Sequence, residues 1–365
     1  MKIARQHMDA VLQANSAADL LPIIQKVIEL EHATIPPYLC GYFTIRQGSN
    51  DLAAEIIRSV VVEEMLHLTI ACNLMNALGG APSIDSPDFV PDYPGELPFG
   101  IGEHFQVHLR KCSVDQVRDV FMKIEEPEDP IDIPVVRSMD EMKAAVAQFD
   151  LTIGALYQAL SLVIQQLEAA AQADGKTIFV GDKSRQVAPR KWFPDPDEMF
   201  AIANVDDAAR AIKVIIDQGE GTTTDPFDLG QQPAHYYRFE QIVEGKMLEK
   251  RPGETPPYAF SGEPVVLDTS RIFDMDDNPK IANYREGSNA RRMATQFSYN
   301  YTKLLKSLHD TYNGNPDGID RSMGGMYELR FSALQALETK AEWADDSNTA
   351  DKQTGLSFEY VPVNL

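Results

Sequence analysis

The stretch Val60-Val61-Val62-Glu63-Glu64-Met65-Leu66-His67-Leu68 carries the strongest structural signal in this sequence. It lies in the middle of a helix predicted for residues 51–78. At helical spacing, Glu64 and His67 fall on one stripe, so both side chains are expected to point into a core. The other members of the stripe are apolar or small: Ile57, Val60, Val61, Leu68, Ala71, Leu74, Met75 and Leu78. A buried ionised carboxylate needs a cation, a hydrogen-bond network or a metal ion beside it, and that choice decides the function.

Composition narrows the class of protein. The chain has 365 residues, of which 44% are hydrophobic, and this is enough for a sizeable core in one large domain or two smaller ones. It carries 33 Lys and Arg against 55 Asp and Glu, a formal charge of -22. Such a surface repels nucleic acid and anionic membranes, so the sequence predicts neither as a partner.

The cysteines and the N-terminus favour a cytoplasmic protein. Cys40, Cys72 and Cys112 are not spaced as metal ligands, and Cys72 is expected to fill space inside its helix. The first residues lack the apolar core of a signal peptide. No run of 18 apolar residues occurs, so no transmembrane helix is expected.

The hydrophobic periodicity predicts a mainly α fold, a four-helix bundle with long crossings, short strand insertions and extra C-terminal helices. The four principal helices are expected at 17–43, 51–78, 139–173 and 234–245, and further helices at 113–124, 206–218, 289–312 and 321–339. Short strands are expected at 176–180 and 265–267. We predict one domain over 1–365, with the bundle core at 17–245 and a C-terminal extension at 246–365 packed on it.

Local signals define the ends of the first two helices. Ser16 or Asp19 can cap the first helix, and Pro36-Pro37 are expected to kink or interrupt it. The second helix should be capped by Asn50 or Asp51 and should end at Gly79-Gly80.

Two further buried polar residues accompany Glu64 and His67. Glu31 interrupts an otherwise apolar stripe of the first helix, and His235 heads an apolar face of the fourth. Carboxylates and imidazoles that project into a bundle from different helices are typical of a metal site. We therefore predict that Glu31, Glu64, His67 and His235 bind iron, with manganese or zinc as alternatives.

Several motifs resemble the iminophenyl-pyruvate dimer synthase family, a ferritin-like family that includes relatives of violacein and rebeccamycin pathway enzymes. The matching stretches are Glu29-Leu30-Glu31-His32-Ala33-Thr34-Ile35-Pro36-Pro37-Tyr38-Leu39, Val62-Glu63-Glu64-Met65-Leu66-His67, Ile153-Gly154-Ala155-Leu156-Tyr157, Asp217-Gln218-Gly219-Glu220-Gly221 and Ala234-His235-Tyr236-Tyr237-Arg238-Phe239. The resemblance implies a ferritin-like bundle and a non-haem metal site. It also implies oxidative coupling of imines of aromatic 2-oxo acids, with O2 and a small imino acid as partners.

The sequence departs from the ferritin-type ligand pattern at two places. The third helix offers no Glu near Ala155, and Gln232 stands where a Glu is expected three residues before His235. Glu168 lies more than three turns from Ala155 and is a poor substitute. The remaining ligands suffice for one ion, so we predict a single-ion site.

Other polar residues near the predicted ligands are expected to support the site or line a pocket. Glu63 can reach His67 at i, i+4, and His32 points about 100° away from its neighbour Glu31, as expected for adjacent helical residues. Tyr38, Tyr157 and Gln232 are further pocket candidates, although a buried tyrosine also fits a core with a hydrogen-bonded hydroxyl.

Three functions remain open from the sequence. The preferred one is an oxidative enzyme of natural-product or amino-acid-derived metabolism; the alternatives are a non-catalytic metal-binding or storage bundle and a degenerate metal-free scaffold. The long irregular crossings at 81–103 and 176–230 favour a substrate cavity. The sequence leaves open the substrate and whether the chain forms a homo-oligomer.

Overall fold

A computed structural model describes residues 3–100, 105–127, 139–140, 143, 152–219, 226–228 and 231–363. The described chain is mainly helical, as predicted. Its helices are α1 (Arg5–Leu12), α2 (Ala17–Thr44), α3 (Asp51–Ala77), α4 (Val114–Gln116), α5 (Met122–Ile124), α7 (Ile153–Ala173), α8 (Val205–Gly219), α9 (His235–Glu244), α10 (Asn289–Tyr312) and α11 (Ile319–Leu337). A π-helical stretch, Val117–Phe121, joins α4 to α5.

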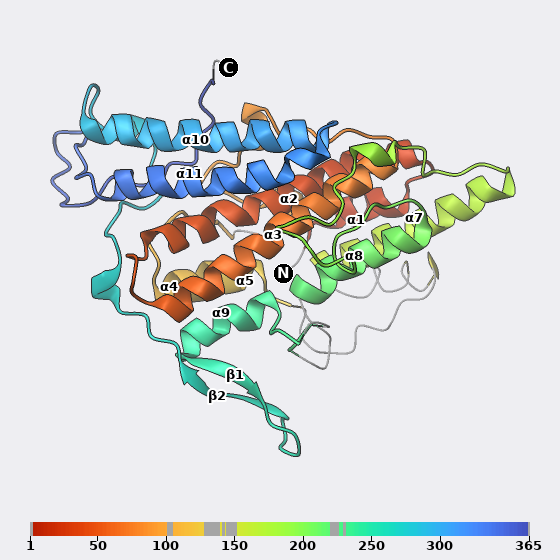
Figure 1. Cartoon of the computed structure of the whole chain (residues 1–365), viewed down its shortest axis with the longest axis horizontal. Helices are drawn as coiled ribbons and strands as arrows, with labels where there is room; N and C mark the ends of the chain where they lie inside the picture. Colours follow the sequence, from red (N-terminus) through yellow and green to blue (C-terminus); the bar gives the residue numbers. More distant parts are fainter. Residues whose placement is uncertain are drawn as a thin grey trace.

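Helices α2 and α3 pack along each other in the middle of the molecule (Figure 1). Helices α10 and α11 form a second pair that packs against them, in agreement with the predicted C-terminal helices. Helix α7 packs on α8, and both α8 and α9 contact α3 on the side away from α10. The polar stripes of α2 and α3 therefore face a space that α7, α8 and α9 enclose.

Helix α2 continues through Pro36 and Pro37, so of the predicted kink or interruption, the interruption is wrong. Because Pro37 has no N–H, the carbonyl of Ala33 loses its helical partner. The Tyr93 hydroxyl donates a hydrogen bond to that carbonyl over 2.9 Å, within a buried environment. A side chain from the following loop thus replaces the missing backbone donor. At the other end, Ser16 caps the helix as predicted.

Helix α3 ends at the predicted glycines, but it is not capped as expected. Gly79 adopts φ +83°, the left-handed conformation that terminates helices. Asn50 occupies the N-cap position at φ 53°, yet its side chain makes no cap hydrogen bond. It bonds instead to the backbone of Asp268, on the chain that follows β2.

The third principal helix begins later than predicted. Thr152 is the N-cap of α7, and its side chain accepts a hydrogen bond from the backbone N–H of Ala155. A helix cannot continue through an N-cap with extended backbone (φ −112°, ψ 175°), so residues 139–173 do not form one helix. The predicted stripe members Val146 and Phe149 lie outside the described residues.

The strands also differ from the prediction. Residues 176–180 and 265–267 are not strands; the described sheet is an antiparallel hairpin of β1 (Lys246–Lys250) and β2 (Tyr258–Pro264). This hairpin extends from the end of α9, away from the helices (Figure 1). The predicted helices at 113–124, 206–218 and 234–245 are confirmed to within a residue or two.

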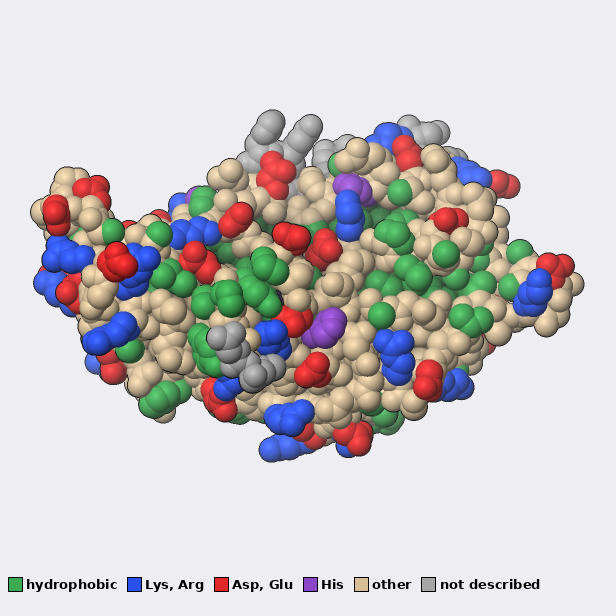
Figure 2. All heavy atoms as spheres, turned by 90° about the horizontal axis from the view of Figure 1, so that it is seen from above, with side chains coloured by type: hydrophobic (Ala, Val, Ile, Leu, Met, Phe, Trp, Pro, Cys, Tyr) green, Lys and Arg blue, Asp and Glu red, His purple; other side chains and the backbone are tan. Residues whose placement is uncertain are grey.

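No helix among the described residues is long and apolar enough to cross a membrane. On the face drawn in Figure 2, acidic side chains are scattered among basic ones, with hydrophobic side chains gathered between them. The net charge of -22 is therefore not concentrated in one acidic patch on that face.

Candidate metal centre

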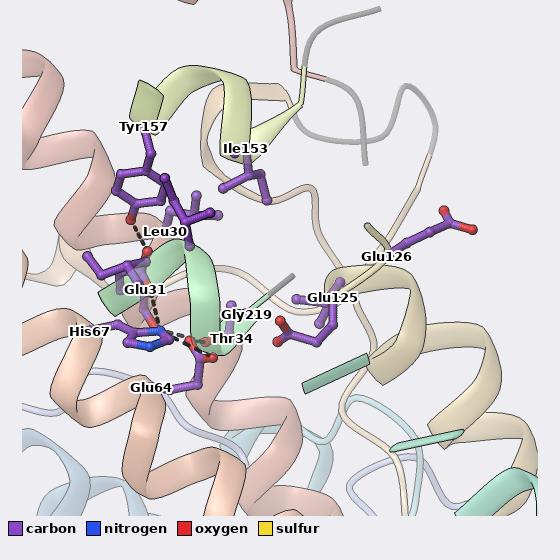
Figure 3. A pocket seen from close by; sticks show the side chains of 14 residues that line it. Leu30, Glu31, Thr34, Glu64, His67, Glu125, Glu126, Ile153, Tyr157 and Gly219 are labelled. Atoms are coloured by element: carbon purple, nitrogen blue, oxygen red, sulfur yellow. Dashed lines mark hydrogen bonds and ion pairs between the residues drawn. The ribbon is translucent and has the colours of Figure 1, made fainter. Parts of the chain in front are cut away.

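The first group of potential ligands joins α2 and α3. Glu31, Glu64 and His67 each offer one ligand atom, and these atoms lie within 4.8 Å of one another. The Nδ1 atom of His67 is 3.6 Å from Glu31 Oε2 and 3.8 Å from Glu64 Oε1. Figure 3 shows the three side chains converging. The predicted inward orientation of all three is thereby confirmed.

A second group shares Glu64 with the first. It consists of Glu64, Glu125 and His235, again with ligand atoms within 4.8 Å of one another. The Nδ1 atom of His235 lies 2.8 Å from Glu64 Oε1 and 3.5 Å from Glu125 Oε2. The rings of His67 and His235 are stacked with centroids 5.4 Å apart. Glu64 therefore stands between two adjacent three-residue groups.

All four predicted ligands are brought together and deeply buried, with 5%, 3%, 2% and 0% of their surface exposed for Glu31, Glu64, His67 and His235. The third carboxylate, Glu125, was missed by the sequence reasoning. In Figure 3 it faces the cluster, whereas its neighbour Glu126 points away.

Glu125 comes from the helical stretch at 114–124, and not from α7, where the ferritin pattern placed the missing carboxylate. It is the C-cap of α5. Val117 and Phe121, the buried residues eight and four positions earlier, continue along the same side of the helix to Glu125. The stretch Val117–Phe121 is π-helical, with i→i+5 hydrogen bonds in place of i→i+4. The wider turn shifts which residues fall on the buried side of the helix. The period of an ordinary α-helix therefore does not assign Glu125 to the interior.

Two tyrosines hold the outer carboxylates. The Tyr157 hydroxyl of α7 donates a hydrogen bond to Glu31 Oε1, and the Tyr38 hydroxyl of α2 donates one to Glu125 Oε1. Tyr157 lies two residues after Ala155 on the helix where the ferritin-type pattern expects a Glu. Both hydroxyls thus orient carboxylates of the cluster, and neither tyrosine is only a core aromatic.

The shared carboxylate is held by a threonine. The Thr34 hydroxyl can donate to Glu64 Oε2 over 2.9 Å or to the backbone carbonyl of Glu31 over 2.8 Å. Because a hydroxyl has only one hydrogen, it can serve one of these acceptors at a time.

The two histidines are supported by different residues. His67 Nε2 lies 2.9 Å from the amide oxygen of Gln218, whose Nε2 in turn donates to Glu198 over 3.1 Å. Since an amide oxygen only accepts, this contact favours a proton on His67 Nε2, with Nδ1 facing the cluster. Gln218 belongs to the Asp217–Gly221 motif that carried part of the resemblance.

His235 is supported by a carboxylate. Its Nε2 lies 2.9 Å from Glu63 Oε2, and Arg238 donates to the other oxygen of Glu63 over 2.7 Å. Asp228 lies 3.6 Å from the second terminal nitrogen of Arg238. Glu63 therefore bonds to a candidate ligand, but this residue is His235 and not His67, with which the sequence spacing paired it.

Burial and neighbouring charges shift the pKa values of the residues in the cluster. Burial raises the pKa of Glu64 to about 7, and the nearby charge of Glu125 adds to this, although His235 opposes both. Burial would lower the pKa of His235, but the negative carboxylates of Glu125, Glu63 and Glu64 beside its ring raise it well above its ordinary value. Burial would raise the pKa of Glu63, yet His235 and Arg238 bring it to about 2. The negative charges of these buried carboxylates therefore favour a cation, either a protonated histidine or a metal ion, between them.

Two other predicted residues lie away from the cluster. Gln232 is exposed, and its backbone N–H bonds the side chain of Asp228, so it is not a pocket residue. His32 is buried against Phe89, with Nε2 2.7 Å from the Tyr301 hydroxyl, and burial lowers its pKa to about 3. His32 is thus a neutral core residue, and it is not among the residues that line the cavity beside the cluster.

A cavity of about 60 Å³ opens beside the first group. Its polar wall includes Glu31, Glu64, His67 and Glu125, and its apolar wall includes Leu30, Ile124, Ile153, Ile215 and Ile216. A small molecule in this cavity contacts the cluster on one side and hydrocarbon on the other.

The residues present fit a metal ion. His235 Nδ1 is buried and has no hydrogen-bond partner of suitable geometry among the described residues, although Glu64 Oε1 is 2.8 Å away. An imidazole nitrogen held in this way, with its opposite nitrogen bonded to a carboxylate, is the usual arrangement of a metal-binding histidine. Two imidazoles and three carboxylates suit iron, manganese or zinc.

Fold and cluster together define a helical bundle with a carboxylate–histidine centre between its helices. The ferritin-like family matches residues 24–244, more than half of the sequence, and the chain belongs to that family. A crystal structure of a ferritin-like protein from Caulobacter vibrioides is similar, with a TM-score of 0.58 and 20% identity over 94% of this chain and 97% of that one. At this identity the likeness concerns the fold alone. No curated protein matches the sequence.

Proposed function

We propose that this protein is a non-haem metalloenzyme whose centre binds two iron-class ions in the groups Glu31–Glu64–His67 and Glu64–Glu125–His235. The observation that carries the proposal is the shared Glu64, because a carboxylate with one ligand group on each side can bridge two ions. This proposal replaces the single-ion site predicted from the sequence, because the predicted set of ligands did not include Glu125.

An oxidative reaction is the activity that this site supports best. Bound iron supplies the electrons for reaction with O2. The protein itself orients the ligands through Tyr157 and Tyr38, keeps the imidazoles in the ligating form through Gln218 and Glu63, and lines the approach with hydrocarbon. A dry, apolar wall limits the access of water to the reacting atoms.

The proposed substrate class is a small aromatic imino acid. Its support is the sequence resemblance, together with the isoleucine and leucine side chains along the cavity, which suit an aromatic ring. A storage bundle is the alternative, and it predicts uptake of many ions per chain without consumption of an organic substrate.

Metal analysis of the purified full chain, after expression with added iron, tests the proposal. We expect about two ions per chain, close to none for Glu64→Ala and about one for His67→Ala. Glu55→Ala, an exposed acid on the same helix, should keep both. Absence of any transition metal from the unaltered protein would refute a metalloenzyme, and one ion per chain would refute the two-ion centre.

Activity is tested separately from metal content. With iron bound, O2 should be consumed when an aromatic 2-oxo acid and ammonia are present, since these form the imine in solution. Iron uptake far above two ions per chain, without substrate-dependent O2 consumption, would instead establish storage.

A further inference from the structure

A second pocket lies where α2 gives way to α3, and it shares no lining residue with the metal centre. Its volume is about 380 Å³. Three arginines line it: Arg46 from the connecting loop, Arg58 from α3 and Arg330 from α11. Two acids of the first turns of α3, Asp51 and Glu55, complete its charged groups. The pocket thus gathers positive charge in a chain whose net charge is -22.

None of these three guanidinium groups forms an ion pair with a carboxylate anywhere in the part of the chain that the structure describes. Other arginines of this acidic chain do find partners; Arg110 pairs with Asp277 and Arg285 with Asp346, both over 2.9 Å. An arginine presents five N–H donors and no acceptor. The pocket therefore holds a set of donors that lack an anion.

Aromatic rings fix two of the three guanidinium groups. The Cζ atom of Arg330 lies 4.7 Å from the ring centroid of Tyr42, and its Nη1 donates to the Tyr42 hydroxyl over 2.6 Å. The Cζ atom of Arg46 lies 3.8 Å from the ring centroid of Phe273. Stacking occupies the face of a guanidinium and leaves its in-plane donors available for a bidentate acceptor. Both side chains are half-buried, so little flexibility remains to be lost when an anion binds.

The start of α3 adds to this positive environment. The helix begins at Asp51, which lines the pocket, and the Asn50 side chain turns away to Asp268 without capping it. First-turn N–H groups and the helix dipole favour an anion at such an end.

We propose that this pocket binds a small anion bearing a phosphate or carboxylate group, received by the donor forks of Arg46 and Arg330 with Arg58 at the rim. Planar bidentate recognition of these groups is the chemistry for which arginine is suited. Asp51 and Glu55 accept hydrogen bonds from hydroxyl or amino groups of the same molecule, so the ligand is an anionic metabolite and not a bare halide.

Calorimetric titration of the full chain with inorganic phosphate and, separately, with citrate tests the pocket, at constant ionic strength set with sodium chloride. We expect one anion per chain, and at least a tenfold loss of affinity in Arg46→Met, Arg330→Met and Arg58→Met, because a hydrogen bond to a charged group is removed. Methionine retains the apolar stem that packs on the rings. Arg58 is exposed, so its substitution leaves folding unchanged.

Arg321→Met is the matched control, since Arg321 is an exposed arginine of α11 outside the pocket. It should bind the anion as the unaltered protein does. Binding of phosphate alone or of citrate alone supports the proposal and decides which group the pocket prefers. Equal affinity in all variants would mean an adventitious ion only and would overturn the proposal. The absence of a heat of binding with both anions would also overturn it.

Discussion

Glu63 Oε2 lies 2.9 Å from Nε2 of His235, so one of the two ligand histidines donates its outer N–H to a carboxylate. The other, His67, donates to the neutral amide oxygen of Gln218 over the same distance. An imidazole whose N–H is bonded to a carboxylate is more basic, and so binds a metal more strongly, than one whose N–H is bonded to an amide. The two halves of the proposed centre are therefore inequivalent, with the His235 half the stronger.

Glu63→Gln is expected to weaken metal binding at the His235 half by 10- to 100-fold, because it replaces the carboxylate with an amide like that of Gln218. A metal titration of this variant should then show two similar affinities, whereas we expect the unaltered protein to bind its ions in two separate steps. Isothermal titration with Mn²⁺ or Fe²⁺ under anaerobic conditions gives both constants.

Glu55→Gln makes the same change of charge on an exposed residue of α3 and should leave both binding steps unchanged. If Glu63→Gln behaves like Glu55→Gln, the asymmetry between the two histidines has no consequence for the metal.

Glu125→Ala is expected to remove one of two bound ions and leave the Glu31–Glu64–His67 group occupied. The physical reason is that His235 and Glu64 alone offer too few ligands to hold the second ion. Elemental analysis after gel filtration measures the ratio. Glu126→Ala, at the neighbouring residue that points away from the cluster, is the control (Figure 3). An unchanged ratio in Glu125→Ala would show that Glu125 is not a ligand.

The helices and four of the five residues of the proposed centre were predictable from the sequence, because both depend on local periodicity. Glu31, Glu64 and His67 interrupt long apolar stripes, and a polar residue on such a stripe has to be buried with a partner. His235 was found in the same way from the short stripe that it heads. The stripes assign a side chain to the interior, but they do not say which interior groups meet.

What the sequence reasoning missed depends on contacts between distant segments. Glu125 lies at the end of a short helix with a π turn, where a strict 3.6-residue period no longer assigns the face. The donor that replaces the missing N–H of Pro37 comes from Tyr93, which is remote in sequence from Ala33. The hairpin at 246–264 likewise formed where no alternating pattern had indicated strands.

Tyr157→Phe and Tyr38→Phe are expected to destabilise the metal-free protein by about 1–3 kcal/mol each, since each leaves a buried carboxylate short of a hydrogen bond. The loss should shrink when metal is bound, because the ion then compensates the charge of Glu31 or Glu125. Urea denaturation with and without Mn²⁺ measures the difference. Tyr93→Phe, which removes a hydrogen bond to a backbone carbonyl, should cost the same in both states. An equal cost in both states for Tyr157→Phe would place that hydroxyl outside the metal site.

The stability that Glu168 contributes is expected to depend on pH, whereas metal binding is expected not to depend on this residue. Its carboxylate receives hydrogen bonds from the backbone N–H of Ile178 over 2.8 Å and from Thr177 and Gln172, and thereby anchors the chain that leaves α7. Burial would raise the pKa of Glu168, but these hydrogen bonds outweigh it and lower the pKa below its ordinary 4.5.

A carboxylate with a lowered folded-state pKa contributes stability above its unfolded-state value and loses that contribution as the pH falls through the folded-state value. The Glu168→Gln variant is therefore expected to be less stable than the unaltered protein at neutral pH and to approach it as the pH falls below 4.5. Thermal melting between neutral and acidic pH measures both curves. Metal content at neutral pH should be unchanged, because Glu168 belongs to neither ligand group; loss of bound metal would mean that this carboxylate contributes to the centre after all.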